Sequence, residues 1–360
     1  PWHDHKQVFN FAEAWRKDQP FAYQVHRSEF DQILMRNALR SGVDAIEGCR
    51  VTAVDFLPDN AGAEVHAQHE DGREQRWRAR FVVDASGRDT FLANRFKIKH
   101  RNPKHNSSAV YGHFSGAKRH EGQAEGNITI FWFEHGWFWF IPLKDGLTSI
   151  GMVTWPYFIK TRGERSMDQF LLDGVKLCPP LAGRLENAAL VRPVEATGNF
   201  SYVSERTHGR NYLLLGDAYA FIDPVFSSGV LLAMNSAFLG ADAIDTCLRL
   251  PNIAEAALAD FDRKMKHGPK EFSWFIYRVT NPVMRDMFMA PRNLLRVKEA
   301  LLSVLAGDIF GKTPIWRSVL VFKVLYYVLS IVEYKRAWAA WQRRQGNIKP
   351  VEDAEVGASA

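Results

Sequence analysis

The sequence predicts an α/β protein in which a β-rich domain interrupts an α/β domain and a helical region follows. Two apolar stretches, 81–83 and 212–215, each lead into an acidic residue close to a glycine, as strands do where an open α/β sheet meets a ligand crevice. The segment between them has many strand patterns, and the chain after Pro251 has helical spacing. We therefore expect an α/β domain in two pieces, 1–106 and 204–250, with a β-rich substrate domain at 107–203 between them. A helical region at 251–345 and a disordered tail at 346–360 should follow.

The first predicted element is a helix that begins near Arg27. Ser28 can act as its N-cap, and Asp31, three residues later, makes a pattern similar to a capping box. The helix should end near Ser41-Gly42. Four apolar residues fall on one of its faces at helical spacing: Phe30, Ile33, Leu34 and Ala38.

Strands should follow at 50–56, 63–69 and 77–83, with a hairpin turn at Asp71-Gly72. The third strand leads into the segment 84–88, where an acid, small residues and a glycine end the apolar run. This is the same arrangement as the one at the end of the strand 212–215, so both strand ends are candidates for one ligand site.

The β-rich segment has its strongest strand patterns at 129–132 and 138–141. Pro142 and the Asp145-Gly146 turn separate its strands, and one helix is predicted at 166–177.

Two apolar helices are predicted in the rest of the chain, at 230–248 and 318–332. The second is apolar nearly all round, is interrupted by Lys323, and is shorter than the roughly 20 residues that span a bilayer. We predict a buried helix rather than one on a membrane surface, and no transmembrane segment.

The composition narrows the function classes. The net charge of +6 is modest and the basic residues are scattered, so a nucleic-acid partner is not expected. Cys49, Cys178 and Cys247 lie far apart without a CxxC spacing, which indicates a reducing, cytoplasmic location and no cysteine zinc site. The histidines show no metal-like clustering, so we expect no metal.

The stretch 211–230, "NYLLLGDAYAFIDPVFSSGV", carries the clearest chemistry. Asp217 follows a buried strand and can accept hydrogen bonds from ligand hydroxyl groups, while Gly216 lets the backbone come close. The alternative is an aspartate that binds its own turn.

The same stretch then places Pro224 before Ser227-Ser228-Gly229, where the next helix begins. A helix N-terminus suits an anion or the electron-rich edge of a heterocycle. The alternative is a helix capped by one of its own serines, Ser227 or Ser228.

Taken as a whole, Gly216 to Gly229 resembles the second flavin-binding motif of the FAD-dependent monooxygenase-like fold, and "FIDPVFSSGV" looks closest to flavin-dependent halogenases that act on phenol or pyrrole rings. "YQVHRSEFDQIL" (23–34) is similar to the helix that follows the crossover of the FAD domain in that family. By this resemblance Arg27 reaches the FAD phosphates or the adenosine. "FVVDASG" (81–87) resembles the turn beside the adenine half, through Asp84 and Gly87.

"GWFWFIPL" (136–143) fits the W-x-W-x-I-P signature of flavin-dependent halogenases. The matching residues are Trp137, Trp139, Ile141 and Pro142. The resemblance implies that the two tryptophans keep the substrate away from the flavin, and strand alternation places both on one face. The alternative is a pair of core tryptophans stacked on a sheet.

The resemblance implies a glutathione-reductase-like FAD domain and a set of ligands. Asp217 would hold the ribityl chain of FAD, and the segment from Pro224 to Val230 would aim a helix N-terminus at the flavin ring. Chloride or bromide would bind near Ser227, Ser228 and Gly229. A partner reductase would supply reduced FAD, and the substrate would be a small aromatic molecule, free or bound to a carrier protein.

Two features of the family pattern are absent from the sequence: the glycine-rich G-x-G-x-x-G loop and the halogenase lysine. Lys6 and Lys17 lie outside any matching motif. Because the chain starts at Pro1 rather than at a methionine, we expect an N-terminally truncated chain without its first βαβ unit, which would bind FAD poorly. The resemblance places the catalytic lysine upstream of Pro1. The alternatives are an aromatic hydroxylase or isoprenoid-type reductase of the same fold, and a non-catalytic fragment.

Overall fold

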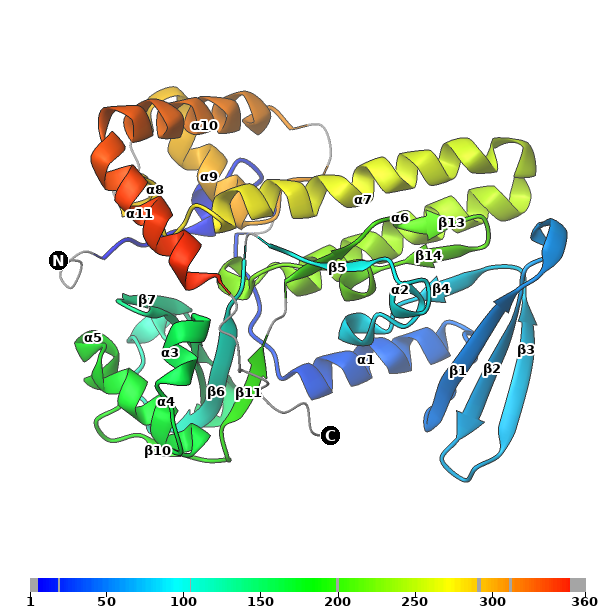
Figure 1. The fold of residues 1–360 in the computed structure, drawn as a ribbon, viewed down its shortest axis with the longest axis horizontal. Coiled ribbons are helices and arrows are strands. Elements are labelled where there is room, and N and C mark those ends of the chain that lie inside the picture. The colour runs from blue at the N-terminus through cyan, green and yellow to red at the C-terminus, as the bar shows by residue number, and fades with distance from the viewer. Residues whose placement is uncertain are drawn as a thin grey trace.

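The computed structural model describes residues 6–18, 20–103, 105–198, 201–289, 293–310 and 313–349. Figure 1 shows a small antiparallel sheet at one end, two long antiparallel helices across the middle, and a larger sheet and a helical cluster at the other end. The first half of the α/β part has these elements: α1 (Arg27–Arg40), β1 (Cys49–Phe56), β2 (Ala63–His69), β3 (Glu74–Ala79), β4 (Val82–Asp84), α2 (Phe91–Arg95) and β5 (Lys99–Arg101).

Two expectations concern the ends of the chain. Pro1, upstream of which the catalytic lysine is expected, lies outside the described residues, so that expectation stays a prediction. Most of the predicted tail 346–360 also lies outside them. Its first two residues, 346 and 347, end helix α11 (Tyr334–Asn347) instead of beginning a disordered segment.

Strands β1, β2 and β3 form an antiparallel sheet. The predicted hairpin turn is confirmed, with Gly72 at φ 85°, a conformation that glycine adopts without strain. The predicted strand 77–83 is divided. Its first part ends β3 at Ala79, and its second part is β4, which pairs in parallel with β14 (Tyr212–Leu214) in a different sheet.

Helix α1 begins at Arg27 but is not capped as expected. His26 is the N-cap, Ser28 makes no capping bond, and Asp31 accepts hydrogen bonds of 3.0 Å from Arg27 instead. The predicted apolar face is present, but no residue of α1 is buried, and Ile33 is 58% exposed.

The β-rich part is a six-stranded sheet in the order β10-β6-β9-β8-β7, with β11 paired to β6. Its two strongest predicted strands are confirmed as β7 and β8, and the predicted helix as α4, capped by Ser166. Strand β12 (Tyr202–Ser204) pairs with β5 and β15 (Ala220–Phe221), so the end of the range 107–203 lies outside this sheet. The elements are β6 (Ser108–Ser115), β7 (Thr129–Phe133), β8 (Gly136–Pro142), β9 (Thr148–Thr154), α3 (Pro156–Lys160), α4 (Met167–Lys176), α5 (Pro179–Ala182), β10 (Ala189–Leu190) and β11 (Glu195–Gly198).

The two faces of β8 pack against different parts of the molecule because side chains alternate along a strand. Phe138 and Phe140 are fully buried in a core with Phe170 and Leu171 of α4. Trp137 points the other way and packs with the helical region. The strand that carries the signature therefore lies between two cores.

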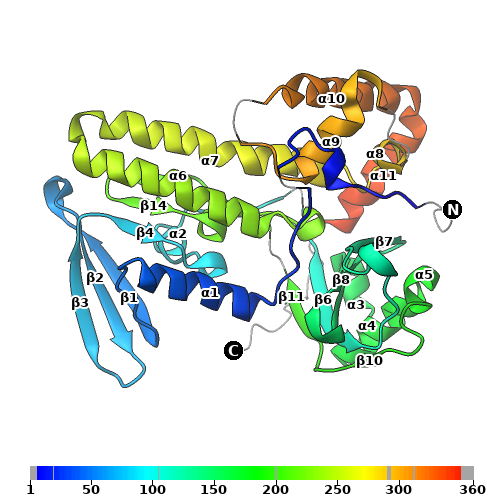
Figure 2. The ribbon, with the colours of Figure 1, turned by 180° about the vertical axis from the view of Figure 1, so that it is seen from behind.

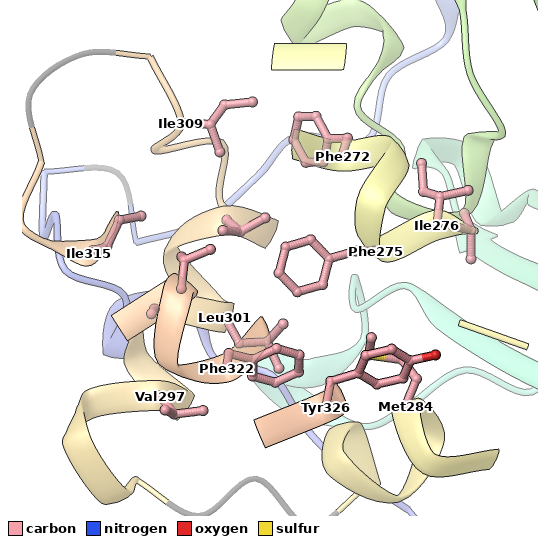
Figure 3. Close-up of a cluster of buried hydrophobic side chains, with 14 of the residues drawn as sticks. Phe272, Phe275, Ile276, Met284, Val297, Leu301, Ile309, Ile315, Phe322 and Tyr326 are labelled. Carbon is pink, nitrogen blue, oxygen red and sulfur yellow. The ribbon is translucent and has the colours of Figure 1, made fainter. Parts of the chain in front are cut away.

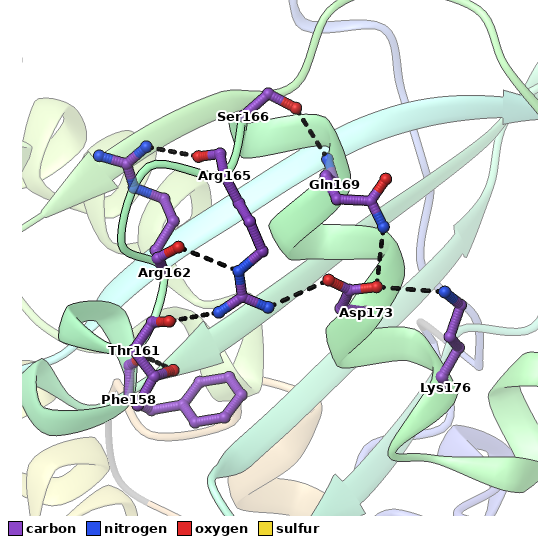
Figure 4. A network of polar contacts seen from close by, with 8 residues as sticks. All are labelled: Phe158, Thr161, Arg162, Arg165, Ser166, Gln169, Asp173 and Lys176. Atoms are coloured by element: carbon purple, nitrogen blue, oxygen red, sulfur yellow. Dashed lines mark hydrogen bonds and ion pairs between the residues drawn. The ribbon is translucent and has the colours of Figure 1, made fainter.

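A network of polar contacts caps the start of α4 and continues along the helix (Figure 4). Ser166 Oγ accepts a hydrogen bond from the Gln169 amide at 3.1 Å. The carboxylate of Asp173 accepts hydrogen bonds from Gln169, Lys176 and Arg165 at 2.8, 3.1 and 3.0 Å. These polar side chains, from the start of α4 to its last residue, find their partners within the segment 161–176.

The helical region packs one continuous core of large apolar side chains, which Figure 3 shows at the meeting of α7, α8, α9 and α10. Phe272, Phe275 and Phe322 are each no more than 2% exposed. Its elements are α7 (Ala254–Ile276), α8 (Pro282–Met289), α9 (Val297–Leu305), α10 (Ile315–Val332) and α11. The second half of the α/β part has β13 (His208–Gly209), which pairs with β14, and the long helix α6 (Gly229–Arg249).

The prediction that 318–332 is a buried helix is wrong for one of its faces. In α10 only Ile315, Val319, Phe322 and Tyr326 are buried, and Ile331 at the opposite side is 74% exposed. By length and composition, two helices of the described chain, α6 and α10, could cross a membrane.

Candidate functional site

The two strands that end in an acid lie side by side. Strand β14 pairs in parallel with β4, Leu214 opposite Asp84, and the Leu215 amide donates to the Asp84 carbonyl at 2.9 Å. Gly216 follows at φ 52°, and a Cβ atom there would lie 3.0 Å from the Cβ of Ala233 in α6. A glycine is needed both for this backbone conformation and for the close approach of α6.

The carboxylate of Asp84 is committed to the backbone. Its Oδ1 accepts from the Ser86 amide at 2.9 Å and its Oδ2 from the Leu92 amide at 2.7 Å, and the residue is 5% exposed. Gly87, at φ 63°, continues this turn. Asp84 and Gly87 thus shape the edge of the site, and the expectation that they lie beside the adenine half of FAD stays a prediction.

The carboxylate of Asp217, unlike that of Asp84, lacks hydrogen-bond donors among the described residues. Asp217 is partly buried in the 3-10 helix η6 (Gly216–Ala218), and its carboxylate accepts no hydrogen bond from any described residue. Burial raises the pKa of Asp217, and the nearby positive charges of Arg88 and Arg27 oppose this shift. A carboxylate in this position lacks donors, which the hydroxyl groups of a ligand can supply.

Arg27 lies at the start of α1 and is close enough to act on Asp217 electrostatically. Its guanidinium is paired with Asp31 and is 64% exposed. The structure therefore brings Arg27 near the second motif, although 190 residues of sequence separate it from Asp217.

Lys17, the lysine next before Arg27, is held by its own segment. Lys17 donates hydrogen bonds to the carbonyls of Ala12 and Ala14 at 3.0 and 2.5 Å, so its ammonium group is bound to the N-terminal segment itself. The expected place of the catalytic lysine, upstream of Pro1, lies outside the described residues.

The start of α6 is uncapped. Asp223 caps the preceding 3-10 helix η7 (Pro224–Phe226) through the Val225 amide at 3.0 Å, and Ser227 turns the chain at φ 51°. Ser228 is the N-cap of α6, but its side chain makes no capping bond. Its hydroxyl is buried and has no partner among the described residues.

The expected alternative, a helix capped by Ser227 or Ser228, is therefore wrong. Gly229 and Val230 are the first two residues of α6, and apart from the adjoining residues and the backbone of the helix itself no described atom lies within 4 Å of a Cβ built at Gly229. The helix end presents free amide groups, a buried unpaired hydroxyl and open space in one place, which suits a small anion or the edge of a flavin.

The tryptophans of β8 lie on one face, as expected from strand alternation. The rings of Trp137 and Trp139 are 6.0 Å apart at 53°, and Trp139 Nε1 donates to Ser149 Oγ at 3.1 Å. Gly151 lies opposite Trp139 in β9, and a Cβ there would be 2.1 Å from the indole ring. Ile141 is on the same face, and Pro142 ends the strand.

A pair of residues that the sequence did not single out lies beside Trp137. His105 Nε2 is 2.7 Å from Asp223 Oδ2 and 3.0 Å from Ser107 Oγ. Because a carboxylate only accepts hydrogen bonds, Nε2 carries a proton, and Nδ1 is buried without a partner among the described residues. His105 and Asp223 are 118 positions apart, so no local motif could have revealed the pair.

These residues line a pocket with an empty volume of about 330 Å³, which includes space open to solvent. Arg344 of α11 closes one side, and burial lowers the pKa of its guanidinium to about 10. The lining residues are His105, Ser107, Trp137, Val153, Thr154, Trp155, Asp223, Ile276, Val279, Thr280 and Arg344.

A family model for tryptophan halogenase matches residues 5–282. The chain belongs to the tryptophan halogenase family. The resemblance seen in the motifs is confirmed, and so is the predicted fold: the crystal structure of CmlS, a flavin-dependent halogenase, has a TM-score of 0.71 at 26% identity and covers 88% of this chain and 55% of CmlS. The myxobacterial chondrochloren halogenase CndH has a TM-score of 0.69 at 32% identity, with 85% of this chain and 72% of CndH covered.

Two relatives of known activity are also similar in sequence. A 1H-pyrrole-2-carbonyl-[peptidyl-carrier protein] chlorinase of Pseudomonas fluorescens is 28% identical over 313 residues, covering 84% of this chain and 68% of the relative. The flavin-dependent halogenase armH2 of Armillaria mellea is 34% identical over 281 residues, covering 72% and 53%. The chain spans about half the length of several such relatives.

Proposed function

We propose that this chain carries the halide and flavin-ring half of a FAD-dependent halogenase that acts on an electron-rich aromatic compound of the phenol or pyrrole type. The observation that carries the proposal is the start of α6, where the buried Ser228 hydroxyl has no partner among the described residues and the helix is uncapped. Family membership and the carrier-bound pyrrole substrate in the name of one relative support the substrate class, free or carrier-tethered.

The residues present fit one half of FAD. Gly216, with no room for a side chain, and Asp217, short of hydrogen-bond donors, suit a ribityl chain, and the start of α6 suits the electron-rich edge of the ring. The sequence contains no G-x-G-x-x-G loop for the pyrophosphate. When bound, reduced FAD with O2 would supply the oxidising equivalent that converts halide into an electrophilic halogen.

The protein's own residues then have positioning roles. The amides of Gly229 and Val230 and the Ser228 hydroxyl would hold chloride or bromide at the positive end of the helix dipole. Trp137 and Trp139 would form a wall between flavin and substrate. The hydrogen bond to Ser149 and the room left by Gly151, which has no side chain, would fix the position of the Trp139 ring. We also propose a reductase partner and a cytoplasmic location, the latter supported by three free cysteines.

The test is a halogenation assay of the full-length protein with FAD, a flavin reductase, O2 and bromide. We expect a flavin absorbance band on the purified protein and a brominated phenol or pyrrole detected by mass spectrometry. Hydroxylated product that does not depend on halide would contradict the proposal, as would the lack of flavin binding.

A pair of matched variants tests the halide site within this assay. Ser228→Ala removes a hydrogen bond to a charged group and should raise the KM for bromide about tenfold. Ser166→Ala makes the same change at the capped start of α4 and should leave this KM unchanged. Equal effects of the two variants would show that Ser228 does not contact the halide.

A further inference from the structure

The outer faces of α10 and α11 expose more large apolar side chains than any neighbouring pair of helices in the described chain. On α10, Leu320, Val324, Val328 and Ile331 form one stripe at helical spacing and are 61%, 51%, 50% and 74% exposed. Val332 continues this stripe to the end of α10 at 73% exposure. Contiguous apolar surface of this kind marks a site of interaction.

The stripe continues on α11, where the apolar residues are aromatic. Trp338 and Trp341 stack at 4.9 Å and are 57% and 49% exposed, and Tyr334 is 62% exposed. These three residues fall at spacings of four and three, on one side of the helix. We call the eight residues on the two helices the α10–α11 face: Leu320, Val324, Val328, Ile331, Val332, Tyr334, Trp338 and Trp341.

The face cannot turn inward, because the opposite sides of both helices are anchored. Val319 and Phe322 of α10 are buried in the helical core, and Lys323 pairs with Glu271 of α7 at 2.6 Å. On α11, Arg336 pairs with Asp286 of α8 at 2.6 Å. This packing also prevents α10 from crossing a bilayer, since the core would have to open.

The segment that contains α10 and α11 carries a net positive charge, which favours an anionic partner. Between Arg317 and Lys349 the chain has seven basic residues and one acidic residue, Glu333. Arg317, in line with the stripe of α10, and Lys335, next to Tyr334, are exposed and form no ion pair with another described residue. Basic residues beside an apolar helical stripe are the pattern of helices that lie in the headgroup region of anionic membranes.

The chemistry and shape of the face favour a lipid surface over a protein partner. Tryptophan and tyrosine are enriched where a membrane meets water, and here they adjoin a purely aliphatic stripe. Figures 1 and 2 show α10 along the outer edge of the molecule, and Figure 1 shows α11 running inward from its end. The outer side of α10 and of the first turns of α11 can rest on a flat bilayer.

We propose that the α10–α11 face binds the surface of an anionic lipid bilayer, with Trp338 and Trp341 at headgroup level and the aliphatic stripe of α10 at the acyl boundary. This interaction is separate from the proposed halogenation, and it would hold the enzyme at a membrane where apolar aromatic compounds concentrate.

The experiment is sedimentation of the chain with vesicles, together with its tryptophan emission. Vesicles of phosphatidylcholine with phosphatidylglycerol should bind the chain and shift its emission to the blue, and phosphatidylcholine alone should bind at least about tenfold more weakly. Added salt should weaken the binding. No sedimentation with either vesicle would overturn the proposal.

Matched variants locate the contact. Ile331→Glu and the double variant Arg317→Glu/Lys335→Glu should each weaken binding about tenfold or more, because all three residues are exposed, Arg317 lies in line with the stripe of α10, and Lys335 is next to Tyr334. Phe238→Glu on α6 is the control, since Phe238 is 71% exposed and outside the face. Equal binding by all variants would overturn the proposal.

Two further measurements distinguish a membrane from a second copy of this chain and from an acidic carrier protein as the partner of the face. Light scattering should give the same molar mass for the wild type and for Ile331→Glu. A dimer that Ile331→Glu dissociates would assign the face to a second copy of this chain. Tight binding of an acidic carrier protein that Ile331→Glu abolishes, without binding to vesicles, would assign it to that protein. Either result overturns the membrane proposal.

Discussion

Helices α4 and α6 both begin at a serine, yet the two helix starts are built for different purposes. At α4, Ser166 caps the helix, and Asp173 receives three donors, of which the Gln169 side chain contributes most to lowering the pKa of that carboxyl (Figure 4). At α6, Ser228 caps nothing, and nearby Asp217 has a raised pKa because burial is not offset by donors. A polar group that is satisfied within its own segment stabilises the fold, and one left open is available to a ligand.

The difference between the two serines has a conformational cause. Ser166 has φ −59° and ψ 159°, the extended conformation in which an N-cap side chain reaches back to the third amide of its helix. Ser228 has φ −86° and ψ −5°, which is helical and directs the hydroxyl elsewhere. The turn formed by Asp223, η7 and the left-handed Ser227 imposes this conformation.

The largest expected effect comes from breaking that turn. Asp223→Ala removes the cap of η7 and leaves the His105 ring N–H buried without its acceptor, so we expect a loss of about 2–4 kcal/mol in the free energy of unfolding, measured by urea denaturation. Asp173→Ala, which breaks the exposed network at α4, should cost much less. Similar losses for the two variants would contradict the assignment of Asp223 as the residue that organises the site.

A smaller effect should distinguish the two serines directly. Ser166→Ala loses a capping bond and should lower the free energy of unfolding by about 1 kcal/mol. Ser228→Ala loses no bond to a described residue and removes a buried unpaired hydroxyl, so its free energy of unfolding should change by less than about 0.5 kcal/mol. Thermal and urea unfolding of both variants measure the difference, and an equal loss at Ser228 would mean that its hydroxyl is satisfied in solution.

The comparison also explains what the sequence could predict. The start of α4 and the hairpin at Gly72 depend on a few adjacent residues, and both were predicted. The neighbourhood of β4 and β14 was predicted because parallel strands bring their carboxyl ends to one edge. The His105–Asp223 pair was missed because it depends on a contact between distant segments, not on a local pattern.

Two errors concern helices whose surroundings the sequence does not specify. The cap of α1 at Ser28 was wrong because Ser28 lies within the helix, where its side chain cannot reach an unpaired amide ahead of it. For α10, an apolar residue on nearly every side removes the periodicity that would identify the buried face, so burial of only one face could not be predicted. The side of α10 that was wrongly predicted to be buried is part of the exposed α10–α11 face.

The smallest effect is the pH dependence of the two aspartates, and its sign differs between them. The pKa of Asp217 is raised in the folded protein, mainly by burial, so its contribution to stability is full below the unfolded pKa of about 3.9 and is lost as the pH rises through the folded value. The pKa of Asp173 is lowered, first by Gln169 and then by Lys176 and Arg165, so its contribution is present above the unfolded pKa and is lost as the pH falls through the folded value. Urea unfolding of Asp217→Asn and Asp173→Asn between about pH 2 and pH 7 tests both signs. Relative to the wild type, Asp217→Asn should gain stability as the pH rises, and Asp173→Asn should lose it. Parallel curves for the two variants would mean that the open and the closed carboxylate have the same environment, and the distinction between the two helix starts would fail.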